Sequence, residues 1–179
     1  MSEFISQVGP LFYLLTGLSL VGMGLIIERF IFFLSLPKLE NAESFKVLTK
    51  ELENNKNCSK LVRDELLSFR LSDVQAKLMH GIHLLRLLAV LSPMVGLLGT
   101  VLGMIKAFKD ISGQTGPVVP SMIADGLWSA MLTTAYGLSI ALPCLLAAFI
   151  YARIAEKRLE QFQKYLNAQS LKIEGAKLL

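Results

Sequence analysis

Two threonines, Thr100 and Thr134, lie inside long apolar stretches of the sequence, and each belongs to a stripe of small residues. The stripes are Gly96, Thr100, Gly103 and Ala107, and then Ala130, Thr134, Gly137 and Ala141. Both have offsets of 0, 4, 7 and 11 positions, which place residues on one helix face. A hydroxyl donates and accepts hydrogen bonds, so it can pass on a proton or coordinate a cation. The same spacing also suits close packing of membrane helices, and spacing alone does not separate the two interpretations.

The apolar stretches carry no ionisable residue at their middle. Asp125 and Lys106 lie near one end of their stretches, and the pair Glu28-Arg29 lies near the end of the first. Ionisable groups inside a membrane are costly and usually mark an ion path. If ions cross the membrane here, a second protein must therefore supply the carboxylate.

Composition places the chain in a membrane. Of its 179 residues 53% are hydrophobic, and the mean hydropathy is +0.54. The apolar residues fall in blocks, and a block of about 20 spans a bilayer core of roughly 30 Å as a helix. The formal net charge is +4. Its basic residues alternate with acids outside the blocks, so they indicate topology and solvated helix faces rather than nucleic-acid binding.

We expect an all-α membrane protein with three transmembrane helices, the second and third extended into the cytoplasm. Ser121 is the expected N-cap of the third helix. Lys and Arg are dense in the large loop and the tail, so the positive-inside rule puts the N-terminus in the periplasm and the C-terminus in the cytoplasm. The expected segments are 1–36 (periplasmic N-terminus and first transmembrane helix), 37–86 (cytoplasmic helical loop), 87–108 (second transmembrane helix), 109–120 (periplasmic loop), 121–151 (third transmembrane helix) and 152–179 (cytoplasmic helical tail).

This topology gives the two threonines a similar depth. The second helix runs outward and the third inward, so Thr100 and Thr134 both lie on the order of 12–18 Å from the outer edge of the membrane. Two hydroxyls at one depth on small-residue faces would form a polar ring if several copies of the chain assembled.

Two sequence stretches resemble signatures of the MotA/TolQ/ExbB proton-channel family. Ser92–Phe108 (SPMVGLLGTVLGMIKAF) looks like the second-span signature, and Ile123–Pro143 (IADGLWSAMLTTAYGLSIALP) looks like the third-span signature. Together they cover about a quarter of the chain, and the three-span layout extends the resemblance over most of the rest. Two such motifs, in order and on the expected spans, are far more specific than either alone.

The resemblance implies a bacterial inner-membrane homopentamer in which the second and third spans line a central pore. Two copies of a single-span partner of the ExbD/TolR/MotB type would occupy the pore and supply a transmembrane Asp. Ion flow would then do mechanical work on the partner, to energise outer-membrane transport, envelope maintenance or gliding. Thr100 and Thr134 match the family's channel threonines, and Pro93 and Pro143 match its prolines. We add Thr133 and Ser129 to the expected ion path, with Gly96, Gly103, Ala130, Gly137 and Ala141 as its small pore-lining face.

The chain departs from the family pattern at Ser129, where ExbB- and TolQ-like members usually carry Glu. Asp125, four residues earlier, is the candidate that would partly substitute. The Leu-Thr-Thr-Ala-Tyr-Gly run is closer to MotA-like members, but those have four spans, so the layout favours the ExbB/TolQ branch. The departure leaves two ions open, H⁺ and Na⁺.

Three functions are weighed: an ion-driven stator subunit, a structural scaffold that anchors partners through its small faces, and a membrane-embedded enzyme. No nucleophile or paired acid and base lies in a span, so an enzyme is the least supported. No cofactor or metal is expected, since His80 and His83 lack a nearby third ligand and Cys58 and Cys144 suggest no disulfide framework. The threonine pair favours the stator subunit over the scaffold, because packing alone needs no hydroxyl.

Overall fold

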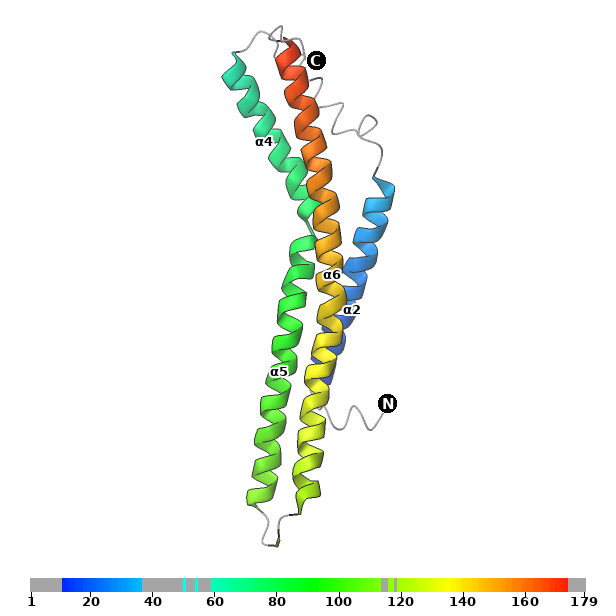
Figure 1. Ribbon diagram of the computed structural model, residues 1–179, viewed down its shortest axis with the longest axis vertical. Coiled ribbons are helices and arrows are strands. Elements are labelled where there is room, and N and C mark those ends of the chain that lie inside the picture. Colours follow the sequence, from blue (N-terminus) through cyan, green and yellow to red (C-terminus); the bar gives the residue numbers. More distant parts are fainter. Residues whose placement is uncertain are drawn as a thin grey trace. The chain divides into compact units, whose positions relative to one another are not determined.

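A computed structural model describes residues 11–36, 50, 54, 59–113, 116–117 and 119–173. Regular secondary structure in these ranges is helical, in the elements α2 (Leu11–Ser35), α4 (Lys60–Met79), α5 (Ile82–Ser112) and α6 (Pro120–Ile173), which Figure 1 shows. The expected periplasmic N-terminus (1–10), much of the cytoplasmic loop (37–58) and the end of the tail (174–179) lie largely or wholly outside the described residues.

Three helices of the described part are long and apolar enough to cross a membrane, as the sequence predicted. They are α2, α5 and the Gly126–Ile173 part of α6. Each contains more than the roughly 20 residues that a bilayer core requires. Little of α2 is buried inside the chain, because most of its apolar side chains point outward. Such a surface is stable only against lipid or another apolar surface.

The helix bounds refine the expected segments. α5 already begins at Ile82, and α6 continues unbroken to Ile173, so both extend beyond a single membrane crossing. The N-cap predicted at Ser121 is wrong, because α6 begins one residue earlier, at Pro120. Proline suits the first helical position, where its fixed φ fits the helix and its missing N–H would be unbonded in any case.

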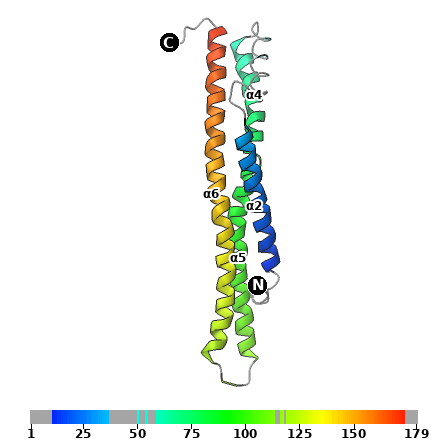
Figure 2. The same cartoon turned by 90° about the vertical axis from the view of Figure 1, so that its right-hand side faces the viewer.

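The chain divides into two compact units, and the first combines Met1–Glu28 with His83–Ala148. Within it α5 and the first part of α6 run antiparallel, joined by the connection that follows Ser112 (Figures 1 and 2). α2 packs on this pair through contacts that include a ring stack and a glycine. The Phe12 ring stacks on the Tyr136 ring at a centroid distance of 6.0 Å, and Gly22 lies against the Cys144 side chain.

The second unit combines Arg29–Ile82 with Phe149–Leu179. Here α4 packs on the C-terminal part of α6 around Leu67 and Leu166, with Leu71, Val74 and Ile173 beside them. Ser170 Oγ also donates a hydrogen bond to Asp64 Oδ1 at 3.3 Å. The spacing of these α4 residues is that of one helix face, so this part of the charged segment is an amphipathic helix.

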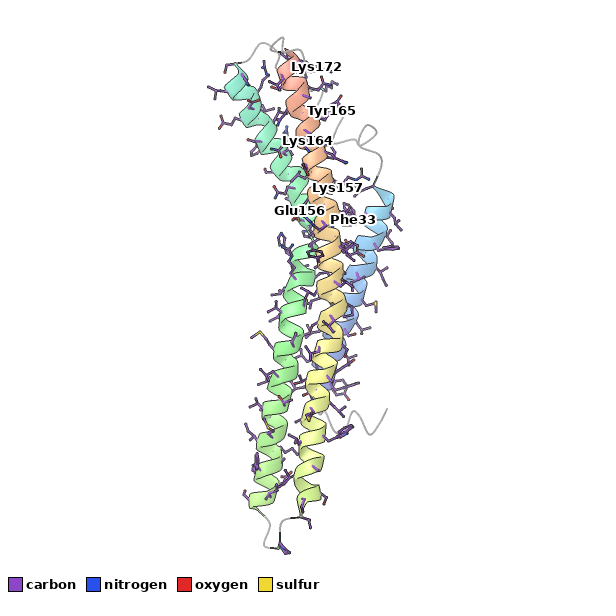
Figure 3. The ribbon with its side chains drawn as sticks, in the orientation of Figure 1. Phe33, Glu156, Lys157, Lys164, Tyr165 and Lys172 are labelled. Atoms are coloured by element: carbon purple, nitrogen blue, oxygen red, sulfur yellow. The ribbon has the colours of Figure 1, made fainter. Side chains whose placement is uncertain are left out.

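The C-terminal part of α6 carries charged side chains on its exposed face. Glu156, Lys157, Lys164 and Lys172 follow one another along the helix (Figure 3). Lys164 Nζ lies 2.7 Å from Glu160 Oε1, four residues apart. The hydrogen bond from Lys164, followed by its positive charge, holds the pKa of Glu160 below its ordinary value. Both side chains are exposed, so this face of the helix is a solvated one. Exposed ion pairs of this kind add little to stability.

In the second unit, the end of α2 lies against the glycine that follows α4. Gly81 joins the two helices with φ of 59°, a conformation that glycine adopts without strain. The Arg29 guanidinium lies directly on Gly81, and the residue as a whole is only 4% exposed. Its Cζ atom is 5.0 Å from the centre of the Phe32 ring, a cation–π geometry. The following residue of α2, Phe33, stacks on Tyr151 of α6 at a centroid distance of 5.4 Å (Phe33 is labelled in Figure 3).

Candidate functional site: the hydroxyl-bearing contact of α5 and α6

Small residues bring the backbones of α5 and α6 into direct contact inside the first unit. A Cβ atom added to Gly96 would lie 2.9 Å from the Thr133 carbonyl oxygen and 3.0 Å from the Thr134 Cα atom. A Cβ atom on Gly137 would lie 2.5 Å from the Ser92 carbonyl oxygen and 3.2 Å from the Gly96 Cα atom. Neither glycine could carry a side chain without moving a backbone, so close approach explains the glycines here.

The contact continues along both helices in antiparallel register. Gly103 faces Ala130, whose Cβ atom would lie 2.8 Å from a Cβ on the glycine. Gly126 faces Ala107 in the same way. The two predicted stripes therefore meet each other within one chain, and Gly96, Gly103, Ala130 and Gly137 all lie in the helix–helix contact. That this face also lines a pore remains a prediction.

The carbonyl oxygen of Gly96 is the centre of a hydroxyl cluster. Thr133 Oγ1 donates to it at 3.0 Å, and Thr134 Oγ1 donates to it at 3.1 Å. Thr133 Oγ1 also lies 2.7 Å from the Ala130 carbonyl oxygen of its own helix. Both hydroxyls cross from α6 to α5, so the predicted ion-path threonines of the third span are also interhelical hydrogen-bond donors.

Thr100 lies one helical turn beyond Gly96 on the same face of α5. Its hydroxyl donates to the Leu97 carbonyl at 2.6 Å, and the side chain is partly exposed. Thr134 is partly exposed as well, whereas Thr133 is buried. The structure thus brings the hydroxyls of Thr100 and Thr134 to neighbouring turns of the helix pair, and two of the three threonines keep access to their surroundings.

The other predicted site residues occupy several environments. Pro93 and Pro143 both lie inside helices, where proline removes one backbone donor. Ser129 is half-buried and Ala141 is buried. The side chain of Asp125 lies outside the described part of the structure, so its expected auxiliary role stays a prediction.

Gly99 was missing from the predicted site. The Thr133 side chain occupies the space where a Cβ atom of Gly99 would be. The signal was present in the sequence, because Gly99 lies three residues after Gly96 and four before Gly103, which is helical spacing. Among the described residues, no group of three or more His, Cys, Asp or Glu side chains lies close enough to hold a metal ion. His80 and His83 are both exposed.

The fold and this contact define a class of protein: a multi-pass membrane protein whose second and third spans form a tight, hydroxyl-bearing helix pair. Residues 39–164 match the family model of the MotA/TolQ/ExbB proton channel family. The chain belongs to this family, and with its three long apolar helices it is a multi-pass protein of the inner membrane.

Named relatives agree with the family. The chain is 39% identical over 119 residues to the biopolymer transport protein exbB1 of Vibrio cholerae, covering 66% of this chain and 52% of that protein. It is 31% identical over 144 residues to the biopolymer transport protein ExbB of Aquifex aeolicus, covering 80% of this chain and 78% of that protein. It is 31% identical over 120 residues to the biopolymer transport protein ExbB of Salmonella typhimurium, covering 67% of this chain and 48% of that protein. Several of these matches thus span about half of the relative's length or less.

Proposed function

We propose that this chain is the channel-forming subunit of an ion-driven stator, which converts proton flow across the inner membrane into mechanical work on a partner protein. One observation carries the proposal. In a chain of a proton-channel family, two threonine hydroxyls meet one carbonyl oxygen where two membrane-long helices touch, and the Thr100 hydroxyl lies one helical turn further along α5. Because a hydroxyl both donates and accepts hydrogen bonds, these neighbouring oxygens suit the passage of an ion from one to the next.

The hydroxyl cluster lacks a titrating group, so a proton path through it needs a partner protein that supplies one. No Asp, Glu, His, Lys or Arg lies between Leu87 and Ile105 or between Gly126 and Ala152. A single-span protein of the ExbD/TolR/MotB type, two copies within a homopentamer of this chain, would add the titrating carboxylate in a central pore. The N-terminus would be periplasmic and the C-terminus cytoplasmic. Relatives named as biopolymer transport proteins support a role in energising transport across the envelope.

The proposal is tested with the complex of this chain and its partner, reconstituted in liposomes under a membrane potential. Thr134→Val and Thr100→Val should each reduce proton uptake by about 10²-fold or more, since a positioned proton-transfer group typically contributes about 10²–10⁴-fold. Ser139→Ala is the matched control, because it removes a hydroxyl from α6 that donates to carbonyls of its own helix. The native mass of each complex shows whether assembly is intact. Wild-type uptake in both valine variants would refute the channel role, and replacing Na⁺ in the medium decides between the two ions.

A structural scaffold is the second candidate, and one observation favours it. The small faces of α5 and α6 are occupied by each other, as in helix pairs that serve only to pack. A scaffold predicts that the valine variants assemble and function normally, so the same experiment separates the two.

A further inference from the structure

We infer that Thr133 is a positioning residue that determines how firmly the Thr134 hydroxyl is held. The inference rests on the proposed function, since it concerns the release of a hydroxyl within the ion path. It assigns Thr133 a role different from that of Thr134, although the two are adjacent in the sequence and donate to the same oxygen.

The Thr133 side chain is fixed in place. It is 3% exposed and fills the position above Gly99 that a Cβ atom would otherwise take. Its hydroxyl has one hydrogen but two acceptors in reach, the Ala130 carbonyl at 2.7 Å and the Gly96 carbonyl at 3.0 Å. The hydroxyl therefore has two bonding arrangements that need only a rotation about its C–O bond.

The Gly96 oxygen has more donors than it can serve. A carbonyl oxygen has two lone pairs. Within the α-helical α5, the backbone N–H of Thr100 donates to this oxygen. The hydroxyls of Thr133 and Thr134, at 3.0 and 3.1 Å from this oxygen, are then second and third donors.

Competition links the two hydroxyls. When Thr133 donates to Ala130, the Gly96 oxygen is left for Thr134, which is held. When Thr133 donates to Gly96, Thr134 is displaced, and its partly exposed hydroxyl is available to a carboxylate or a passing ion. Loss of the Thr133 hydroxyl would leave Thr134 permanently bound to Gly96 and slow the ion path without opening the helix pair.

Two matched pairs of variants isolate the oxygen atom. Wild type and Thr133→Val have side chains of one shape with and without the hydroxyl, and Thr133→Ser and Thr133→Ala repeat the comparison in a smaller side chain. In the reconstituted complex, the hydroxyl-bearing member of each pair should take up protons about five times faster, the factor that corresponds to one hydrogen bond of ordinary strength.

The outcomes decide between chemistry and packing. If Thr133 acts by packing, Val equals wild type while Ser and Ala are equally slow, and the inference is overturned. If the Val complex does not assemble by native mass, the Ser and Ala pair decides alone. The Thr134→Val complex separates failure of the proposed function from failure of this inference. Normal proton uptake by that complex refutes the proposed function. Slow uptake by that complex, with no difference within the two Thr133 pairs, refutes only this inference.

Discussion

Gly137 on α6 lies against the carbonyl oxygen of Ser92 on α5, so closely that a Cβ atom on Gly137 would be 2.5 Å from that oxygen. The Cα atom of Gly96 would be 3.2 Å from the same Cβ atom. Both neighbours are backbone atoms, which cannot rotate away as a side chain can. The distance between α5 and α6 is therefore set by the absence of a side chain at this position.

Gly137→Ala should force the two helices apart. We expect the free energy of unfolding to fall by about 1–3 kcal/mol, the usual cost of overfilling a packed contact. The measurement is the thermal midpoint of the purified protein in detergent. Gly24→Ala is the control, because nothing lies within 4 Å of a Cβ atom there, and its midpoint should not fall. Equal midpoints for both variants would show that α5 and α6 are not in backbone contact.

Gly22→Ala should be rescued by a second change on α6. A Cβ atom at Gly22 would lie 2.8 Å from Cys144 Sγ and 3.8 Å from the Leu88 side chain. The single variant should lose about 1 kcal/mol of stability or more, because the sulfur has to move within a packed site. Cys144→Ala in the same chain removes the sulfur, so the double variant should recover part of the loss. A double-mutant cycle of thermal midpoints measures the coupling, and additive effects would argue against the contact.

Gly81→Ala should destabilise the junction of α4 and α5. The left-handed φ of 59° costs a side-chain-bearing residue about 1–2 kcal/mol, and the Arg29 guanidinium fills the space that the methyl group needs. Faster amide hydrogen exchange at the end of α4 is the expected signal. Gly113→Ala serves for comparison, since its Cβ atom would make only ordinary contacts, 3.7 Å or longer. Unchanged exchange in Gly81→Ala would contradict the described turn.

Leu166→Ala should loosen α4 from α6. Leu166 is fully buried, at 0% exposure, and packs against Leu67. Truncation of a buried leucine typically costs 2–5 kcal/mol, and here the cost falls on the α4 contact. Limited proteolysis within α4 should accelerate. Leu61→Ala, at a position 84% exposed on α4, should leave the digestion rate unchanged. A rate in Leu166→Ala no faster than in the wild type would show that Leu166 does not hold α4.

The spans were predictable because bilayer length and apolar blocks are properties of the sequence alone. The small faces were predictable too, since Gly96 and Gly103 recur at helical spacing. Their partners were not: which residue of α6 meets Gly96 depends on the antiparallel register, and that follows from where α5 ends at Ser112 and α6 begins at Pro120. A single-residue shift of that register would have turned Thr133 away from Gly99.

The environment of Arg29 was also beyond the sequence. We interpreted Arg29 with its neighbour Glu28 as a pair near one membrane face. In the structure the guanidinium is covered by Gly81 and the Phe32 ring. Gly81 lies more than fifty positions away along the chain, so the pairing of the two residues is a tertiary contact that no local pattern encodes.

The crowded carbonyl of Gly96 is itself a spectroscopic reporter. Each donor that a carbonyl accepts draws electron density toward its oxygen, weakens the C=O bond and lowers its stretching frequency. A single isotope label on that carbonyl would separate its infrared band from the rest of the backbone. The band would then record the number of hydroxyls bound to Gly96 while the membrane is energised, and so follow the threonines through the transport cycle without any substitution.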